Sequence, residues 1–145
     1  MSKNIFCILL IFLDTNIVID FLGEREQFYE ASAKIVTLAD QKKVKVFTSP
    51  TSITNVYYIL SKFESSKTAL EKIRKFKLLC DISIMDNEVV EKAIHSGFKD
   101  FEDAMQYFSA ISSNCELIIT RNEKDFKNAL IPVMNAESYL QTLNK

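Results

Sequence analysis

Short apolar runs alternate along the chain with stretches in which apolar residues recur at helical spacing. We interpret the runs at residues 5–13, 44–48, 81–85 and 116–120 as strands, and Pro132–Val133 as a marginal edge strand. The first run is apolar throughout, which is typical of a strand in a parallel sheet that helices cover on both faces.

Helical spacing fills the intervals between these strands. The pattern predicts helices over residues 16–22, 28–38, 50–60, 65–80, 86–97 and 101–111, and a closing helix from about Ala136. Gly23 suits the end of the first helix, Ser49–Pro50 the start of the third, and Ser65 or Ser66 the cap of the fourth. Strands that alternate with helices predict right-handed crossovers, so we expect an α/β fold around a central parallel sheet. No repeat or linker divides the chain, and we therefore expect one domain over residues 1–145.

The first apolar run also resembles the core of a signal peptide, because Lys3 precedes it. However, Asp14 ends the run and no small-residue cleavage site follows. The run is also too short to cross a bilayer, which takes about 20 residues. We therefore favour a buried strand in a cytoplasmic protein without a membrane segment, and the signal peptide remains the alternative.

Composition narrows the chemistry that the chain can perform. Lys and Arg number 18 against 19 Asp and Glu, which argues against a polybasic nucleic-acid binder. His95 is the one histidine, so a multi-histidine metal site is excluded. We expect it at a helix end or on the surface. Cys7, Cys80 and Cys115 are far apart and lie in apolar stretches, and we expect three buried free thiols in a reducing compartment.

Polar residues that suit a functional site follow two of the predicted strands and begin one helix. Asp14 comes directly after the first strand, Asp100 and Asp103 open the helix at 101–111, and the segment from Thr120 to Asp125 follows the last clear strand. Each feature alone is also explained by helix capping or turn formation. In a parallel sheet, however, the functional crevice lies beyond the carboxyl ends of the strands, where these segments would meet.

Carboxylates gathered at one edge of a sheet repel one another unless a cation neutralises them. Because no histidine cluster or cysteine pair is available, the sequence favours a hard divalent cation, Mg²⁺ or Mn²⁺, bound by oxygen atoms. Oxygen-only sites of this kind suit the hydrolysis of phosphodiester bonds.

Three boxes in this order resemble those of the PIN-domain family, in its VapC-like ribonuclease form. They are the segment FLDTNIVID from Phe12 to Asp20, the pair Asp103–Ala104 followed by Ala110, and Ile119–Asn122 with Asp125–Phe126. The resemblance implies a three-layer α/β/α domain that binds Mg²⁺ or Mn²⁺ and cuts RNA. It also implies a toxin held by a small antitoxin protein, and a homodimer.

Carried over by position, the resemblance gives Asp14 as the family's first acid and Asp103 as its third. Asn55 stands where the family usually has a second acid, and Asn122 where it has a fourth. An amide oxygen can bind a metal but carries no charge. Asp100 and Asp125 lie close enough in sequence to restore the missing charges. We therefore expect Asp14, Asp103 and Asp100 to be catalytic, and these three with Asn122 and Asp125 to bind the metal.

Further residues are expected to orient the carboxylates or contact the substrate. They are Asn55, Thr15, Asn16, Thr120, Arg121 and Lys124. Among these, Arg121 and Lys124, together with Lys127, are candidates for contacts with RNA phosphates.

Three functions fit this sequence. The first is a metal-dependent endoribonuclease, as the toxin of a toxin–antitoxin pair. The second is a catalytically weak or inactive PIN module that binds RNA or a protein partner, which Asn55 and Asn122 favour. The third is a haloacid-dehalogenase-like phosphatase, which needs a second Asp two residues after the first, where this chain has Asn16.

Overall fold

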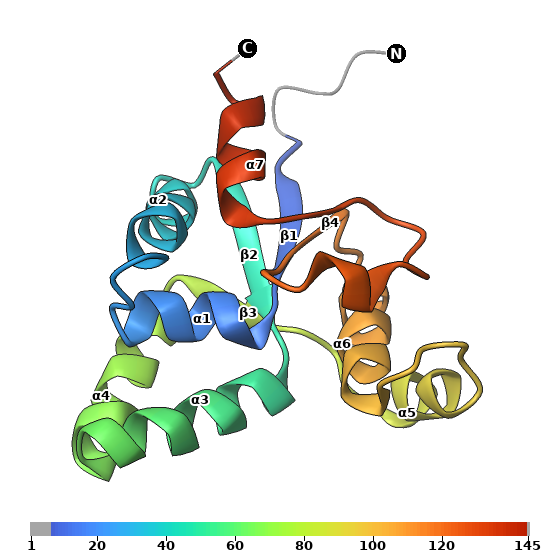
Figure 1. Ribbon diagram of the computed structural model, residues 1–145, viewed down its shortest axis with the longest axis horizontal. Helices are drawn as coiled ribbons and strands as arrows, with labels where there is room; N and C mark the ends of the chain where they lie inside the picture. The colour runs from blue at the N-terminus through green and yellow to red at the C-terminus, as the bar shows by residue number, and fades with distance from the viewer. Residues whose placement is uncertain (1–6, 145) are drawn as a thin grey trace.

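The computed structural model describes residues 7–144, which form one five-stranded parallel sheet in the order β3-β2-β1-β4-β5 (Figure 1). Its strands are β1 (Leu9–Leu13), β2 (Val44–Thr48), β3 (Cys80–Ile82), β4 (Leu117–Ile119) and β5 (Val133–Met134). The helices are α1 (Thr15–Leu22), α2 (Tyr29–Asp40), α3 (Pro50–Phe63), α4 (Ser66–Lys77), α5 (Asn87–Ile94), α6 (Phe101–Ser112) and α7 (Ala136–Thr142), with a 3₁₀ helix, η1 (Glu123–Phe126).

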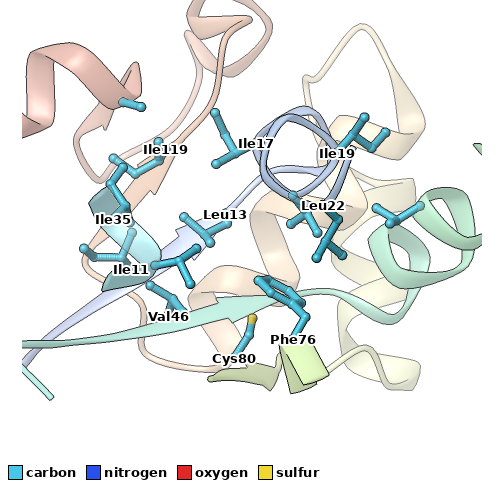
Figure 2. Close-up of a cluster of buried hydrophobic side chains, with 14 of the residues drawn as sticks. Ile11, Leu13, Ile17, Ile19, Leu22, Ile35, Val46, Phe76, Cys80 and Ile119 are labelled. Carbon is cyan, nitrogen blue, oxygen red and sulfur yellow. The ribbon is translucent and has the colours of Figure 1, made fainter. Parts of the chain in front are cut away.

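Successive side chains of the central strand β1 enter different cores, because the strand is buried on both faces. Ile11 and Leu13 join the larger core, which Figure 2 shows, with residues of α1, α2, α3, α4 and α7. Phe12 points the other way, into a smaller core with Tyr107 of α6 and Phe126 of η1. The sheet thus lies between two helical layers, and the expected three-layer α/β/α fold around a parallel sheet is confirmed.

The capping residues predicted several helix starts correctly. Ser49 caps α3 by accepting a hydrogen bond from the Ser52 amide, with Pro50 in the first turn, and Ser65 caps α4 in the same way. Asp86 caps α5 through the Val89 amide, and Gly23 follows α1 as expected. The strand over 44–48 and the helix start at Ala136 are also confirmed.

Two strand predictions differ from the structure. The strand expected at 81–85 is β3, Cys80–Ile82, so Cys80 belongs to a strand and not to the apolar stripe of the preceding helix. The strand ends early because the next residues turn toward α6: the Ser83 hydroxyl bonds that of Ser109, and the Ile84 amide donates to Ser113 Oγ. The strand expected at 5–13 begins at Leu9, and positions 5 and 6 of that prediction lie outside the described residues.

The cysteine prediction is correct for two thiols and wrong for the third. Cys80 and Cys115 are buried, and burial raises the pKa of both thiols, so they are poor nucleophiles. Cys7 is exposed, because it precedes the first residue of β1. His95 ends α5 on the surface as expected. No helix within residues 7–144 is long and apolar enough to span a bilayer.

Candidate active site

The Asp14 carboxylate is held at the carboxyl end of β1 by donors from three parts of the chain. Its Oδ1 accepts hydrogen bonds from the Thr15 amide at 2.9 Å and from Gln106 Nε2 at 3.1 Å. Its Oδ2 accepts from Thr120 Oγ1 at 2.7 Å and lies 3.5 Å from Asn16 Nδ2. Because Leu13 pairs with Ile119, Asp14 and Thr120 leave neighbouring strands side by side. The orientation of the carboxylate is therefore fixed before any substrate arrives.

The N-terminus of α6 brings further acids to this edge of the sheet. Asp100 caps the helix by accepting a hydrogen bond from the Asp103 amide at 3.0 Å. Asp100, Asp103 and Asp125 of η1 line one pocket of about 210 Å³. The fold thus brings three of the acids predicted from the sequence into one pocket, although Asp125 lies more than 20 residues after Asp100 and Asp103 in the chain.

Burial and the neighbouring acids both act on the pKa of Asp103. The pKa of Asp103 is raised to about 7, first by burial and then by the negative charges of Asp100, Asp125, Asp14 and Glu102, in that order. Asp14 therefore belongs electrostatically to the same cluster. A bound cation would relieve this repulsion.

The side chains fit a hydrated divalent cation better than a closed metal cage. Within residues 7–144, no three Asp, Glu, His or Cys side chains stand close enough together to hold a metal ion by themselves. The acids around Asp103 supply only oxygen atoms, the donors that Mg²⁺ and Mn²⁺ prefer. Mg²⁺ in proteins is commonly bound by one or two carboxylates and keeps several of its water ligands. The acids at this edge of the sheet can therefore bind Mg²⁺ even though they do not surround one point.

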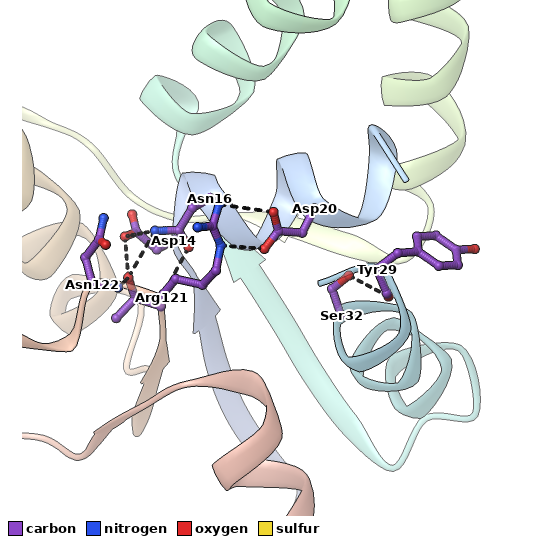
Figure 3. A network of polar contacts seen from close by, with 8 residues as sticks. Asp14, Asn16, Asp20, Tyr29, Ser32, Arg121 and Asn122 are labelled. Carbon is purple, nitrogen blue, oxygen red and sulfur yellow. Dashed lines mark hydrogen bonds and ion pairs between the residues drawn. The ribbon is translucent and has the colours of Figure 1, made fainter. Parts of the chain in front are cut away.

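The two amides at expected acid positions have different surroundings. Asn55 of α3, at the position where the family usually has an acid, donates from Nδ2 to Glu102 Oε1 at 3.3 Å. The Glu102 carboxylate of α6 therefore lies beside this amide. Asn122 follows β4, and its backbone amide donates to Thr120 Oγ1 at 3.1 Å. Its side chain lies near Asp14 in Figure 3.

Arg121 binds a carboxylate of α1 in the structure. Its guanidinium donates to both carboxylate oxygens of Asp20 in α1, at 2.8 and 3.2 Å, and lies 4.1 Å from the centre of the Phe28 ring. A buried carboxylate therefore binds two of the three guanidinium nitrogens of Arg121, and a phosphate contact by this residue stays a prediction. Lys124 does line the acid pocket, with Lys99 and Lys127.

Two buried polar residues of the site were missed from the sequence. Gln106 of α6 is 1% exposed, and its Nε2 donates to Ser52 Oγ at 2.7 Å as well as to Asp14, while its Oε1 accepts from the Ser49 hydroxyl. Asp20 is 1% exposed and pairs with Arg121. Signals existed for both: Gln106 lies one helical turn beyond Asp103, and Asp20 is the only charge within α1.

Replacing Gln106 by Leu should destabilise the protein by about 2–3 kcal/mol. The change removes the buried hydrogen bonds that Gln106 makes with the Ser49 hydroxyl, with Ser52 Oγ and with the Asp14 carboxylate, and each such bond contributes about 0.5–1.5 kcal/mol, or more where the partner is charged. Urea denaturation monitored by circular dichroism measures the loss. The matched control is Gln141→Leu on the exposed side of α7, where we expect a change within about 0.5 kcal/mol. Equal stabilities for the two variants would contradict the role given to Gln106.

Comparison with known proteins gives a family and a fold. Residues 10–124 match the PIN domain family. Ribonuclease VapC1 of Aquifex aeolicus (strain VF5) is 33% identical over 139 residues, covering 92% of this chain and 95% of that protein.

Solved structures of the same fold include a chain of a toxin–antitoxin complex and a toxin. A toxin–antitoxin complex from Klebsiella pneumoniae contains a chain that superposes with a TM-score of 0.67 at 20% identity, covering 87% of this chain and 97% of that one. Mycobacterium tuberculosis VapC20, described as a sarcin–ricin loop cleaving toxin, superposes with a TM-score of 0.58 at 14% identity, covering 74% and 86%. At these identities the structures support the fold alone.

Proposed function

Because the chain belongs to the VapC-like PIN-domain family, we propose that it is a metal-dependent endoribonuclease and the toxin of a toxin–antitoxin pair. The observation that carries the proposal is the acid cluster at the carboxyl edge of the sheet, where Asp14 and Asp103 come from distant parts of the chain. A relative named as a ribonuclease covers nearly the whole chain, which supports the reaction class. The family match also overturns the phosphatase alternative.

Asp14 and Asp103 are the residues that we propose hold the cation, with Asp100, Asp125 and Asn122 around them. Mg²⁺ or Mn²⁺ bound by these residues would orient the attacking water and stabilise negative charge on the phosphate oxygens. Burial and the neighbouring carboxylates raise the pKa of Asp103, and a cation bound beside it would offset both effects.

The other side chains prepare the site for RNA. Thr120, Gln106 and the Thr15 amide hold the Asp14 carboxylate in one orientation. Lys99, Lys124 and Lys127 line the same pocket as the acids and attract phosphates that flank the cut bond. Water adds to phosphorus and releases a proton, the bond between phosphorus and the 3′-oxygen breaks, and the leaving 3′-oxygen takes up a proton from solvent. The products are a 5′-phosphate and a 3′-hydroxyl.

The test is cleavage of a mixed RNA by the purified chain. We expect cleavage with Mg²⁺ or Mn²⁺, its loss on chelation and its return when the cation is restored. The 5′ ends of the products should be phosphorylated and accept ligation to a 3′-hydroxyl. Cleavage that persists in excess chelator would contradict the proposal.

Replacing Lys124 by Ala should weaken RNA binding in a salt-dependent way. Removing one lysine–phosphate ion pair reduces the slope of log affinity against log salt by about 0.7 for single-stranded nucleic acid. The measurement is fluorescence anisotropy of a labelled RNA oligonucleotide over a range of salt concentrations without divalent cations. Lys34→Ala is the matched control, because this exposed lysine on α2 already pairs with Glu30. A slope for Lys124→Ala equal to that of the control would rule out the ion pair.

Two amides keep a second function open. Asn55 and Asn122 remove two charges from the expected acid set, which favours a weak or inactive PIN module that binds RNA or a protein partner. Metal-independent RNA binding without any cleavage would support this second function.

For either function we propose one domain over residues 1–145, a homodimer, a cytoplasmic location and a small antitoxin partner. The antitoxin rests on the toxin–antitoxin complex among the structural neighbours.

A further inference from the structure

Asp20 is a buried carboxylate that the proposed reaction leaves without a role. It lies on α1, six residues after Asp14, and is 1% exposed. Its two oxygens accept hydrogen bonds from Nε and one terminal nitrogen of Arg121, at 2.8 and 3.2 Å, as Figure 3 shows. Two parallel bonds of this kind fix both the distance and the plane of a guanidinium.

Arg121 is held at two further points. Its guanidinium lies over the ring of Phe28, which precedes α2, at 4.1 Å from the ring centre. Its backbone amide donates to Asn16 Oδ1 at 3.2 Å. The segment that follows β4 is therefore anchored to the start of α1, to the middle of α1 and to the start of α2 through one residue.

The residues on either side of Arg121 belong to the acid site. Thr120 Oγ1 donates to Asp14 Oδ2 at 2.7 Å, and the Asn122 amide donates back to Thr120 Oγ1 at 3.1 Å. The Arg121 side chain runs toward Asp20 and away from Asn122 in Figure 3. Anchoring Arg121 therefore sets where Thr120 and Asn122 stand relative to Asp14.

We propose that Asp20 and Arg121 are positioning residues, which hold the segment after β4 so that Thr120 and Asn122 keep the Asp14 carboxylate ready for the cation. Neither side chain contacts RNA. The inference rests on the proposed function of Asp14, and it replaces the phosphate contact expected for Arg121 from the sequence.

The experiment has to separate positioning from folding, because a buried charge left without its partner is strongly destabilising. Replacing both members of a buried ion pair by apolar residues is often neutral for stability. The main variant is therefore Asp20→Leu combined with Arg121→Met, which keeps a side chain against Phe28. Asp20→Asn is the second variant, since it changes no volume and keeps hydrogen-bonding atoms. Circular dichroism and thermal melting establish that each variant folds.

The matched control changes an ion pair that lies on the surface. Glu30 and Lys34 pair at 3.4 Å on α2 and are well exposed. Glu30→Leu with Lys34→Met makes the same chemical change there. We expect wild-type cation affinity and wild-type kcat for this control.

The readouts are Mn²⁺ affinity by calorimetry, kcat and KM for an RNA oligonucleotide, and the salt slope of RNA binding. Loss of a partner that orients a metal ligand typically costs about 10- to 100-fold in metal affinity or activity, and we expect losses of this size for both Asp20 variants. KM and the salt slope should stay within twofold of wild type. A single Arg121→Lys variant should show a smaller loss of Mn²⁺ affinity and kcat than the Asp20 variants, though still a loss. Lysine keeps the positive charge beside Asp20 but cannot make both hydrogen bonds.

Two results would overturn the inference. One is wild-type Mn²⁺ affinity and kcat in a folded Asp20→Leu, Arg121→Met variant. The other is a raised KM and a salt slope reduced by about 0.7 at unchanged kcat, which assigns Arg121 to a phosphate. If the wild-type chain cleaves no RNA, the proposed function fails, while the Mn²⁺ affinities of wild type and variants still decide this inference.

Discussion

Replacing Asp14 by Asn is expected to lower kcat for RNA cleavage by about 1000-fold or more. The change removes one of the two charges proposed to hold the cation, and a metal site supplies several kcal/mol of stabilisation to the charged transition state. The fold should survive, because asparagine caps helices as well as aspartate does and can still accept hydrogen bonds from Thr15 and Gln106. Rates with Mn²⁺ under single-turnover conditions give the comparison.

Asp86→Asn is the matched control for this experiment. Asp86 caps α5 by the same kind of bond, to the Val89 amide at 3.1 Å, and it is absent from the acid pocket. The control should cleave RNA at the wild-type rate. If Asp14→Asn cleaves within threefold of Asp86→Asn while both fold, Asp14 has no part in the reaction.

Replacing Asp103 by Asn should abolish tight Mn²⁺ binding and yet stabilise the metal-free protein at neutral pH. The folded pKa of Asp103 is raised to about 7 from an ordinary value of 3.8, chiefly by burial and by the neighbouring carboxylates. Between these two pH values the folded state binds more protons than the unfolded state, so stability falls as pH rises from about 4 to about 7. Asparagine does not ionise and escapes this loss. With a discount for the partial exposure of the group, the gain at pH 8 is on the order of 1 kcal/mol.

Denaturation of the metal-free proteins at pH 4 and pH 8, with calorimetric Mn²⁺ titrations, checks both halves of this prediction. The gain should appear at pH 8 and vanish near pH 4. Glu88→Gln on the first turn of α5 is the control, because this exposed acid lies outside the pocket and pairs with Lys92. Unchanged Mn²⁺ affinity in Asp103→Asn would remove this residue from the metal site.

Much of the local structure was predictable because it depends on neighbouring residues. Ser49, Pro50 and Asp86 mark helix starts whatever else surrounds them, and the continuous apolar run before Asp14 marked a strand covered on both faces. The same reasoning placed Asp14 and Asp103 at one edge of a sheet, since parallel strands present their carboxyl ends together.

What escaped prediction depends on contacts between distant segments. Arg121 was expected at RNA phosphates because nothing in its own segment shows that Asp20, 101 residues earlier, binds it. Gln106 contacts Asp14 across 92 residues, and its place one helical turn beyond Asp103 does not by itself specify that bond. The early end of β3 likewise follows from bonds to Ser109 and Ser113, which the local β-rich pattern does not contain.

A divalent cation held between Asp14 and Asp103 is the feature on which the proposed reaction depends most. The direct measurement is anomalous diffraction from crystals of the wild-type chain soaked in Mn²⁺. We predict an anomalous peak at the carboxyl edge of the sheet, in contact with oxygens of both Asp14 and Asp103. A map without a peak at these carboxylates, from crystals that bind Mn²⁺ elsewhere or not at all, would contradict the proposed metal site and the reaction built on it.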